Sequence, residues 1–295
     1  MNTADFFTHY DDFLIDLRRR DLSLATQNAY QRDLQELRQW ADKYQQSTVD
    51  GRFFIQALKY LSGRNLHPRS LARKLSVWRS YLYYLIEHHH LSENYLAGIK
   101  APKPPSRLPK AIDAEELDRL LDAPDEDNFY TRRDAALFEL LYGSGLRVAE
   151  AVGLNLSDID LNEAWVKVHG KGDKERHVPL GRKSIEALRL YLQERPQNGE
   201  ETALFVNHYG KRISIRRVNQ TLDNWAMRHQ ASRHISPHML RHSFAGQMLQ
   251  GSRDIRAVQE LLGHSRLSTT QIYTQLDFDH LAQVYDDAHP RAKKK

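Results

Sequence analysis

Apolar residues recur every three or four positions along the N-terminal third of the chain, which is the spacing of amphipathic helices. The pattern predicts helices over residues 6–17, 23–44, 53–63 and 68–85. The first of them carries its apolar stripe at Phe6, Tyr10, Phe13 and Leu17. Pro68 suits the first position of the last helix, where its missing N–H is not needed. We therefore expect a small all-helical domain over residues 1–101.

The helix expected at 68–85 also carries basic residues, most of them away from its apolar stripe, namely Arg69, Arg73, Lys74 and Arg79. Such a basic face is common on a solvated surface, and it also fits a DNA groove, where these side chains contact phosphates. Both interpretations stay open, and the four residues are candidate DNA contacts. His88, His89 and His90 follow, but adjacent helical residues point in different directions, so the run indicates a fraying helix end rather than a metal site.

A proline-rich stretch ends the helical pattern. Three of the four residues at 102–105 are prolines, which cannot continue a helix and favour an extended, semi-rigid backbone. We expect a linker over 102–108 and a second domain over 109–295, whose C-terminal tail covers 277–295.

Strand and helix patterns mix in this second domain. Short strands are predicted at 165–168 and 175–178, and the glycine-flanked stretch 169–173 between them predicts a hairpin turn. Asp113 precedes a helix and is followed three residues later by Glu116, which is the pattern of a capping box. Further helices are predicted over 131–142, 148–154, 183–194, 215–230, 237–250, 254–262, 269–273 and from Phe278. The expected fold class is mainly α with a small β-sheet, a helical N-terminal domain being followed by an α+β domain.

Composition narrows the class of protein only modestly. The chain has no cysteine, which excludes disulfides and thiolate metal sites. No apolar run approaches the roughly 18 residues of a membrane helix, and the N-terminus does not resemble a signal peptide. We therefore expect a cytoplasmic protein without membrane insertion. The net charge is +5, with 15 Lys and Arg against 11 Asp and Glu in residues 1–105, and 28 against 27 in the remainder. This balance permits a polyanionic partner.

Two arginines of the second domain suit a phosphodiester. A planar guanidinium offers paired donors to phosphate oxygens and keeps its charge, so a pair of them makes a clamp. Arg147 follows a glycine-rich helix end. Arg241 lies one helical turn after His238, on a helix that begins at Ser236 and directs its N-terminus toward an anion.

A nucleophile and proton donors complete this set. Tyr273 lies nine residues after His264, and a tyrosine can attack phosphorus once its proton is taken, since its reference pKa is near 10. Lys171, at the tip of the expected hairpin, can protonate a leaving 5′-oxygen. Gly263, just before His264, is typical of a helix C-cap. Each residue alone also fits a surface or structural role, and only the joint pattern indicates chemistry on DNA.

The joint pattern resembles the tyrosine site-specific recombinases of the lambda-integrase family. The resemblance rests on the motifs at 142–147 (YGSGLR), 238–245 (HMLRHSFA) and 261–273, with Lys171 between the first two, and it covers essentially the whole chain. These motifs are most similar to the Xer branch. The resemblance implies a core-binding domain that clamps DNA, a catalytic domain and no cofactor or metal.

The resemblance also implies roles for the candidate residues. Tyr273 would form a 3′-phosphotyrosyl bond with the cleaved strand and release a 5′-hydroxyl. Because that bond stores the energy of the broken one, rejoining needs no ATP. The other implied roles are general acid for Lys171, proton transfer for His238, charge stabilisation for Arg147, Arg241 and His264, and support of the clamp for Glu150.

Partners follow from the resemblance as well. It implies a heterotetramer with a XerD-like recombinase on a double-stranded DNA recombination site, resolution of chromosome dimers, and regulation by a septal DNA translocase. The tail from Asp277 would dock into a neighbouring protomer.

Four rival functions are weighed against this one. A phage or mobile-element integrase would use the same chemistry, and a type IB topoisomerase would have a different domain plan. A DNA-binding protein without catalysis would not need the six catalytic candidates. A metal-dependent phosphatase or nuclease using His238, His242 and His264 would need carboxylates in ligand spacing, which the sequence lacks.

Overall fold

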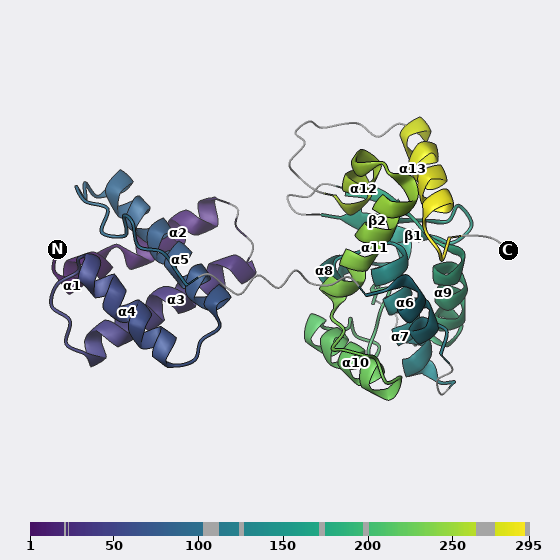
Figure 1. Ribbon diagram of the computed structural model, residues 1–295, viewed down its shortest axis with the longest axis horizontal. Helices are drawn as coiled ribbons and strands as arrows, with labels where there is room; N and C mark the ends of the chain where they lie inside the picture. The colour runs from purple at the N-terminus through teal and green to yellow at the C-terminus, as the bar shows by residue number, and fades with distance from the viewer. Residues whose placement is uncertain are drawn as a thin grey trace. The chain divides into compact units, whose positions relative to one another are not determined.

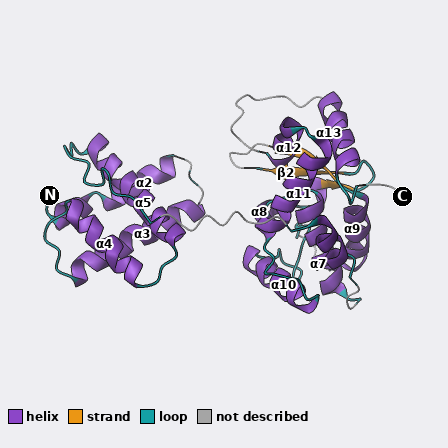
Figure 2. Ribbon diagram, in the orientation of Figure 1, coloured by secondary structure: helices purple, strands orange, loops and turns teal. Residues whose placement is uncertain are grey.

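The chain folds into two compact units, Met1–Arg107 and Leu108–Lys295 (Figure 1). The computed structural model describes residues 1–20, 22, 24–102, 112–123, 127–170, 175–196, 201–263 and 275–292, without the side chains of 275–279. Both units are mainly helical, and a small sheet lies in the second (Figure 2). The predicted fold class is confirmed.

The N-terminal unit consists of helices only in its described part. They are α1 (Thr3–Thr8), α2 (Tyr10–Arg19), α3 (Leu24–Lys43), α4 (Gly51–Gly63) and α5 (Pro68–His88). The last three match the predicted helices closely, and Pro68 occupies the first turn of α5 as expected. The single helix predicted over 6–17 is wrong, because His9 leaves the helical conformation (φ −96°, ψ 22°) between α1 and α2. Phe6, Tyr10 and Phe13 stay buried on both sides of this break, so the apolar spacing does not reveal it.

Aromatic side chains fill the core of this unit. Phe6, Phe54 and Trp78 are fully buried, and Phe6 packs edge-on against Tyr81 with ring centroids 5.1 Å apart. Tyr81 donates a hydrogen bond from its hydroxyl to the Phe6 carbonyl oxygen at 2.6 Å. These rings and the buried aliphatic side chains of α5, such as Leu75 and Leu82, together form one core.

The second unit surrounds its sheet with helices. Its elements are α6 (Ala114–Leu121), α7 (Phe129–Gly143), α8 (Val148–Gly153), the 3-10 helix η1 (Leu156–Asp158), β1 (Ile159–Asp160), β2 (Trp165–His169), β3 (Glu175–Pro179), α9 (Arg182–Glu194), α10 (Ile215–Arg228), α11 (Pro237–Ser252), α12 (Ile255–Leu262) and α13 (Gln275–Ala288). The strands pair antiparallel in the order β1-β2-β3, with Val166 opposite Val178. Val166, Val168 and Val178 are buried, as alternation predicts for a half-buried hairpin.

Two local details differ from the predictions. Strand β1 is two residues long and was not predicted, because so short a segment carries no periodicity. Asp113 caps α6 as expected and accepts the Glu115 N–H at 2.9 Å. Glu116, expected to complete a capping box, instead accepts a hydrogen bond from the Ser232 hydroxyl at 2.6 Å. The predicted helix at 269–273 and the tip of the hairpin lie outside the described residues.

The C-terminal tail packs on its own unit. Helix α13 contacts α11 and α12, and the buried Tyr285 hydroxyl donates to the Gly143 carbonyl oxygen at 2.8 Å. Arg291 is buried and forms ion pairs with Glu139 and, at 3.0 Å, with Asp118. Docking of the tail into a neighbouring protomer, which the resemblance implied, stays a prediction.

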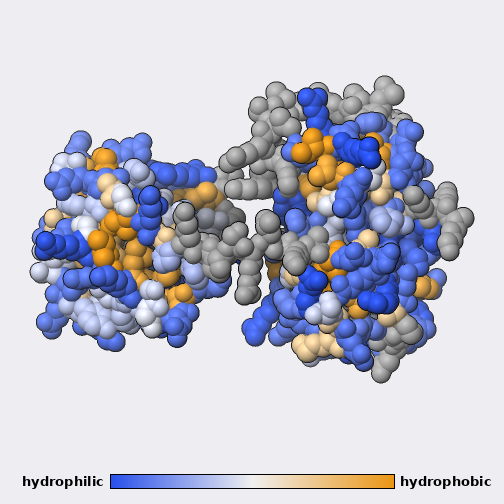
Figure 3. Space-filling view, in the orientation of Figure 1, coloured by the Kyte–Doolittle hydropathy of each residue, from blue (hydrophilic) through white to orange (hydrophobic). Residues whose placement is uncertain are grey.

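The visible surface and the described helices bear on the question of membrane insertion. In Figure 3 the visible face of both units is mostly hydrophilic, with hydrophobic atoms in separate patches. None of the helices in the described ranges combines the length and the apolar content that crossing a bilayer requires.

Candidate active site

Arg147 lies at the start of α8, after a tight turn that follows α7. Gly145 in this turn has φ +61°, and a Cβ there would lie 2.3 Å from the Phe244 ring of α11. Only glycine satisfies both the left-handed backbone and this close approach. The turn places Arg147 with 40% of its side chain exposed, beside the N-terminal half of α11.

Arg241 reaches the same place from α11. Its Nη1 donates to the Gly145 carbonyl oxygen at 2.7 Å, and its Nη2 donates to the Leu262 carbonyl oxygen at 2.6 Å. Burial, the nearby charge of Arg147 and that of Arg176 lower the pKa of Arg241 to about 10, although Glu150 opposes the shift. Two guanidinium groups from distant parts of the sequence are therefore close enough to repel each other.

Glu150 lies between these arginines. Its carboxylate accepts the Arg147 backbone N–H at 2.8 Å and Arg147 Nη1 at 2.7 Å, and it lies 3.7 Å from Arg241 Nη1. Burial raises the pKa of Glu150, but hydrogen bonds from Arg176 and Arg147 outweigh it, so the net shift is downward. Glu150 is ionised at neutral pH, orients Arg147 through two hydrogen bonds and places a negative charge beside Arg241.

Arg176 was not among the predicted site residues. It lies on β3 and is 7% exposed, and both of its terminal nitrogens bind Glu150 at 3.0 and 2.9 Å. The sequence holds one signal for it, because Arg176 shares strand alternation with Val178 and so belongs to the buried face. We call Arg147, Arg176 and Arg241, with Glu150 between them, the arginine cluster.

The other predicted catalytic residues are placed in part. His238 is exposed in the first turn of α11, one turn before Arg241. Gly263 ends α12 in the left-handed conformation (φ 62°), which confirms the predicted C-cap. Three further candidates lie outside the described residues, namely Lys171, His264 and Tyr273.

The candidate DNA contacts of α5 fall into two groups. Arg69 is exposed, whereas Arg79 donates to the Ile99 carbonyl oxygen. Lys74 is 3% exposed and therefore does not lie on a solvated basic face. The reason is its position three residues after Leu71, which turns it toward α3, where Asp33 and Glu36 accept its ammonium group. Arg73 also pairs with Asp33. We call Asp33, Glu36, Arg73 and Lys74 the salt-bridge cluster.

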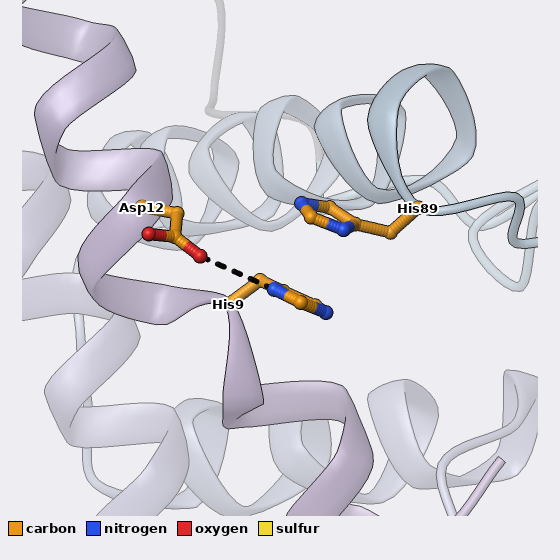
Figure 4. A group of neighbouring side chains, drawn as sticks. All are labelled: His9, Asp12 and His89. Carbon is orange, nitrogen blue, oxygen red and sulfur yellow. Dashed lines mark hydrogen bonds and ion pairs between the residues drawn. The ribbon is translucent and has the colours of Figure 1, made fainter.

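One group among the described residues has donor atoms close enough to suggest a metal ion, namely His9, Asp12 and His89. His9 Nδ1 lies 3.2 Å from Asp12 Oδ2, and the two imidazole rings stack with centroids 3.4 Å apart and planes 14° apart (Figure 4). Parallel rings keep their in-plane lone pairs side by side, whereas zinc needs lone pairs that converge. The group fits a histidine stack beside a carboxylate, and His89 is packed against His9 rather than frayed.

Comparison with known proteins now defines the class. Residues 110–280 match the phage integrase family, and residues 10–89 match the phage integrase N-terminal SAM-like domain. The chain belongs to this family, the tyrosine recombinases, which cleave and rejoin DNA.

The most similar relatives narrow the class further. The chain is 52% identical to tyrosine recombinase XerC of Neisseria meningitidis serogroup C / serotype 2a over 98% of each chain, and 44% identical to that of Azotobacter vinelandii over 97% of each. It is a XerC-like tyrosine recombinase that acts on DNA.

Solved structures agree with this fold. The XerH site-specific recombinase bound to palindromic difH substrate, in a post-cleavage complex, aligns with a TM-score of 0.70 and 25% identity, over 90% of this chain and 81% of the other. The Tn1549 transposon integrase in complex with circular intermediate DNA has a TM-score of 0.71 at 15% identity, over 95% and 98% of the two chains, and shows the fold alone.

Proposed function

We propose that the protein cleaves one DNA strand through a covalent 3′-phosphotyrosyl intermediate. Tyr273 attacks the scissile phosphorus, and the bond to the 5′-oxygen breaks. Lys171 gives that oxygen its proton, so a 5′-hydroxyl leaves. His238 assists proton transfer at the tyrosine, and His264 donates a hydrogen bond to the phosphate. The reverse reaction with another 5′-hydroxyl rejoins the strand without ATP.

The observation that supports this proposal is that Arg147 and Arg241 lie close together, on either side of Glu150. The arginine cluster holds three guanidinium groups, and its ion pairs within the described residues all go to Glu150. Positive charge therefore stays uncompensated at a partly exposed site. An anion is the natural occupant, and a pentavalent transition state, whose oxygens carry more charge than the ground state, is stabilised more than the substrate.

Glu150 also determines which nitrogens of Arg147 are left to bind a ligand. It binds one terminal nitrogen of Arg147 at 2.7 Å, and among the described residues the other nitrogens of that half-exposed side chain have no acceptor. Arg241 instead donates from two of its nitrogens to backbone carbonyl oxygens, which hold it in place. Arg241, held in place, and Arg147, partly exposed, are together suited to bind two oxygens of one phosphate.

We further propose that this chemistry resolves chromosome dimers at cell division. The similarity to XerC proteins over nearly the whole chain supports a heterotetramer with a XerD-like recombinase on a recombination site with two half-sites. Activation by a septal DNA translocase, and action in the cytoplasm, belong to the same proposal.

The covalent intermediate provides the direct test. The duplex is selected for binding from a random-sequence pool and nicked beside the scissile phosphate, so that the cleaved fragment is lost and the adduct accumulates. After denaturation in detergent, we expect a protein–DNA adduct that forms in EDTA and disappears in Tyr273→Phe. An adduct formed by Tyr273→Phe, or none formed by the wild type, would contradict the mechanism.

The role of Lys171 has its own test. Replacing the leaving 5′-oxygen with sulfur removes the need for a proton donor, because a thiolate leaves readily. Lys171→Ala should lose far less activity on this substrate than on the normal one. Equal losses on both substrates would rule out the lysine as general acid.

A further inference from the structure

Arg176 links Glu150 of α8 to the end of α12. It is buried on β3, and its neighbour across the hairpin is Val168. A buried guanidinium is costly unless its donors are paired. All three side-chain nitrogens of Arg176 have partners, and these lie on two elements outside the hairpin, α8 and α12.

The first partner is Glu150. Arg176 Nη1 and Nη2 bind the two carboxylate oxygens at 3.0 and 2.9 Å, which is the bidentate geometry that fixes both groups in one plane. The same carboxylate accepts two hydrogen bonds from Arg147. A rotation of the Glu150 carboxylate would therefore move Arg147.

The second partner is the last turn of α12. Arg176 Nε donates to the Leu261 carbonyl oxygen at 3.1 Å, while Arg241 Nη2 takes the next carbonyl, that of Leu262. A Cβ on Gly263 would lie 3.1–3.2 Å from Arg176 Nη1, Cδ and Cζ. The guanidinium of Arg176 thus lies directly against the backbone at which α12 ends, one residue before His264 in the sequence.

We propose that Arg176 is a positioning residue for strand cleavage. It holds Glu150 and the C-terminal end of α12 in fixed positions relative to each other. This inference rests on the proposed function of the arginine cluster. Arg176 does not need to contact DNA for this role. Through Glu150 it directs Arg147, and through Leu261 it holds the C-terminal end of α12.

The test uses Arg176→Lys, which keeps the positive charge but cannot bind both carboxylate oxygens and the Leu261 carbonyl oxygen together. At saturating nicked duplex we expect adduct formation to slow by about 10²-fold, the cost of a small misplacement of reacting groups. The dissociation constant for the duplex should not change. The matched control is Arg195→Lys, a buried arginine that donates to the carbonyl oxygens of Ala203 and Leu204 outside the cluster. It should lower Tm without slowing the adduct.

A second substrate separates positioning from general damage to the fold. In a methylphosphonate duplex the scissile group is neutral, so an arginine clamp contributes less to cleavage. The penalty of Arg176→Lys should shrink on this substrate in parallel with that of Arg147→Ala. In a Glu150→Gln background, Arg176→Lys should cost much less than in the wild type, because the two act as a unit.

The outcomes are distinct. A wild-type adduct rate in Arg176→Lys, equal penalties on both duplexes, or additive effects with Glu150→Gln would overturn the positioning role and leave the proposed function intact. Absence of any adduct with the wild type would instead overturn the proposed function.

Discussion

The salt-bridge cluster of the first unit and the arginine cluster of the second unit differ in their balance of charge. In the salt-bridge cluster, Arg73 and Lys74 face two carboxylates, and Asp33 and Lys74 are buried against each other at 2.9 Å. The exposed Arg64 also pairs with Glu36, at 3.5 Å. In the arginine cluster, three cations face Glu150. The first arrangement is complete without a partner and stabilises the fold. The second retains positive charge and needs an anion. The number of carboxylates around the basic residues, more than the type of basic residue, therefore distinguishes a cluster that stabilises the fold from one that binds a ligand.

The largest expected effect is on cleavage by Arg241→Ala. Removing this donor from the site should slow adduct formation by about 10³-fold, since a preorganised donor to a transition-state oxygen contributes about 10²- to 10³-fold and Arg241 also orders the Leu262 carbonyl. The rate is measured on the nicked duplex at saturating protein. A rate within about tenfold of the wild type would show that the arginine cluster, like the salt-bridge cluster, only stabilises the fold.

The next effect is on stability, through Lys74→Ala. Asp33 would keep only the half-exposed Arg73 as countercharge, and breaking a buried ion pair costs about 3 kcal/mol of unfolding free energy. Urea denaturation of the full chain measures it. The control Arg73→Ala should cost less than about 1 kcal/mol, because 40% of the Arg73 side chain is exposed. Equal losses of unfolding free energy in the two variants would show that the contribution of each basic side chain does not depend on its burial.

The next effect concerns His289, a fully buried imidazole of the second unit. Burial, together with the charge of Arg291, lowers the pKa of His289 from 6.5 to about 3. The unfolded chain takes up a proton near pH 6.5 and the folded chain does not, so stability is full above pH 6.5 and falls toward pH 3. The expected slope is about 1 kcal/mol per pH unit. His289→Phe, whose ring can keep the stack on Tyr285, should flatten this slope in urea titrations between these pH values. An unchanged slope would assign the acid sensitivity to another group.

The smallest effect concerns Arg69, the exposed basic residue of α5. If it contacts a phosphate, Arg69→Ala should weaken DNA binding modestly and reduce the slope of log affinity against log salt by about one. Fluorescence anisotropy at several salt concentrations measures this. No change in the slope would leave the basic face of α5 as a solvated surface.

Helices were predictable wherever local chemistry determines their ends. Pro68 begins α5 and Gly263 ends α12, and both signals act within one turn. The break at His9 was not predictable, because the apolar spacing continues through it while the helix axis changes. The β1 strand exists through its pairing with β2, which is a tertiary contact.

The candidate site shows the same limit. Arg147 and Arg241 stood out in the sequence because each belongs to a local motif. Arg176 did not, since its partners Glu150 and Leu261 lie 26 and 85 positions away. The burial of Lys74 was likewise hidden, because its countercharge Asp33 is on another helix.

The glycine turn before Arg147 has a consequence for how the enzyme matures. The Phe244 ring occupies the space where a side chain at position 145 would be, so this turn takes its shape from α11, about a hundred residues further along. During synthesis, Arg147 leaves the ribosome long before Phe244 does. We expect Arg147 and Arg241 to take up their positions only when the second unit completes its cooperative folding. An unfinished chain would then be unable to cleave DNA.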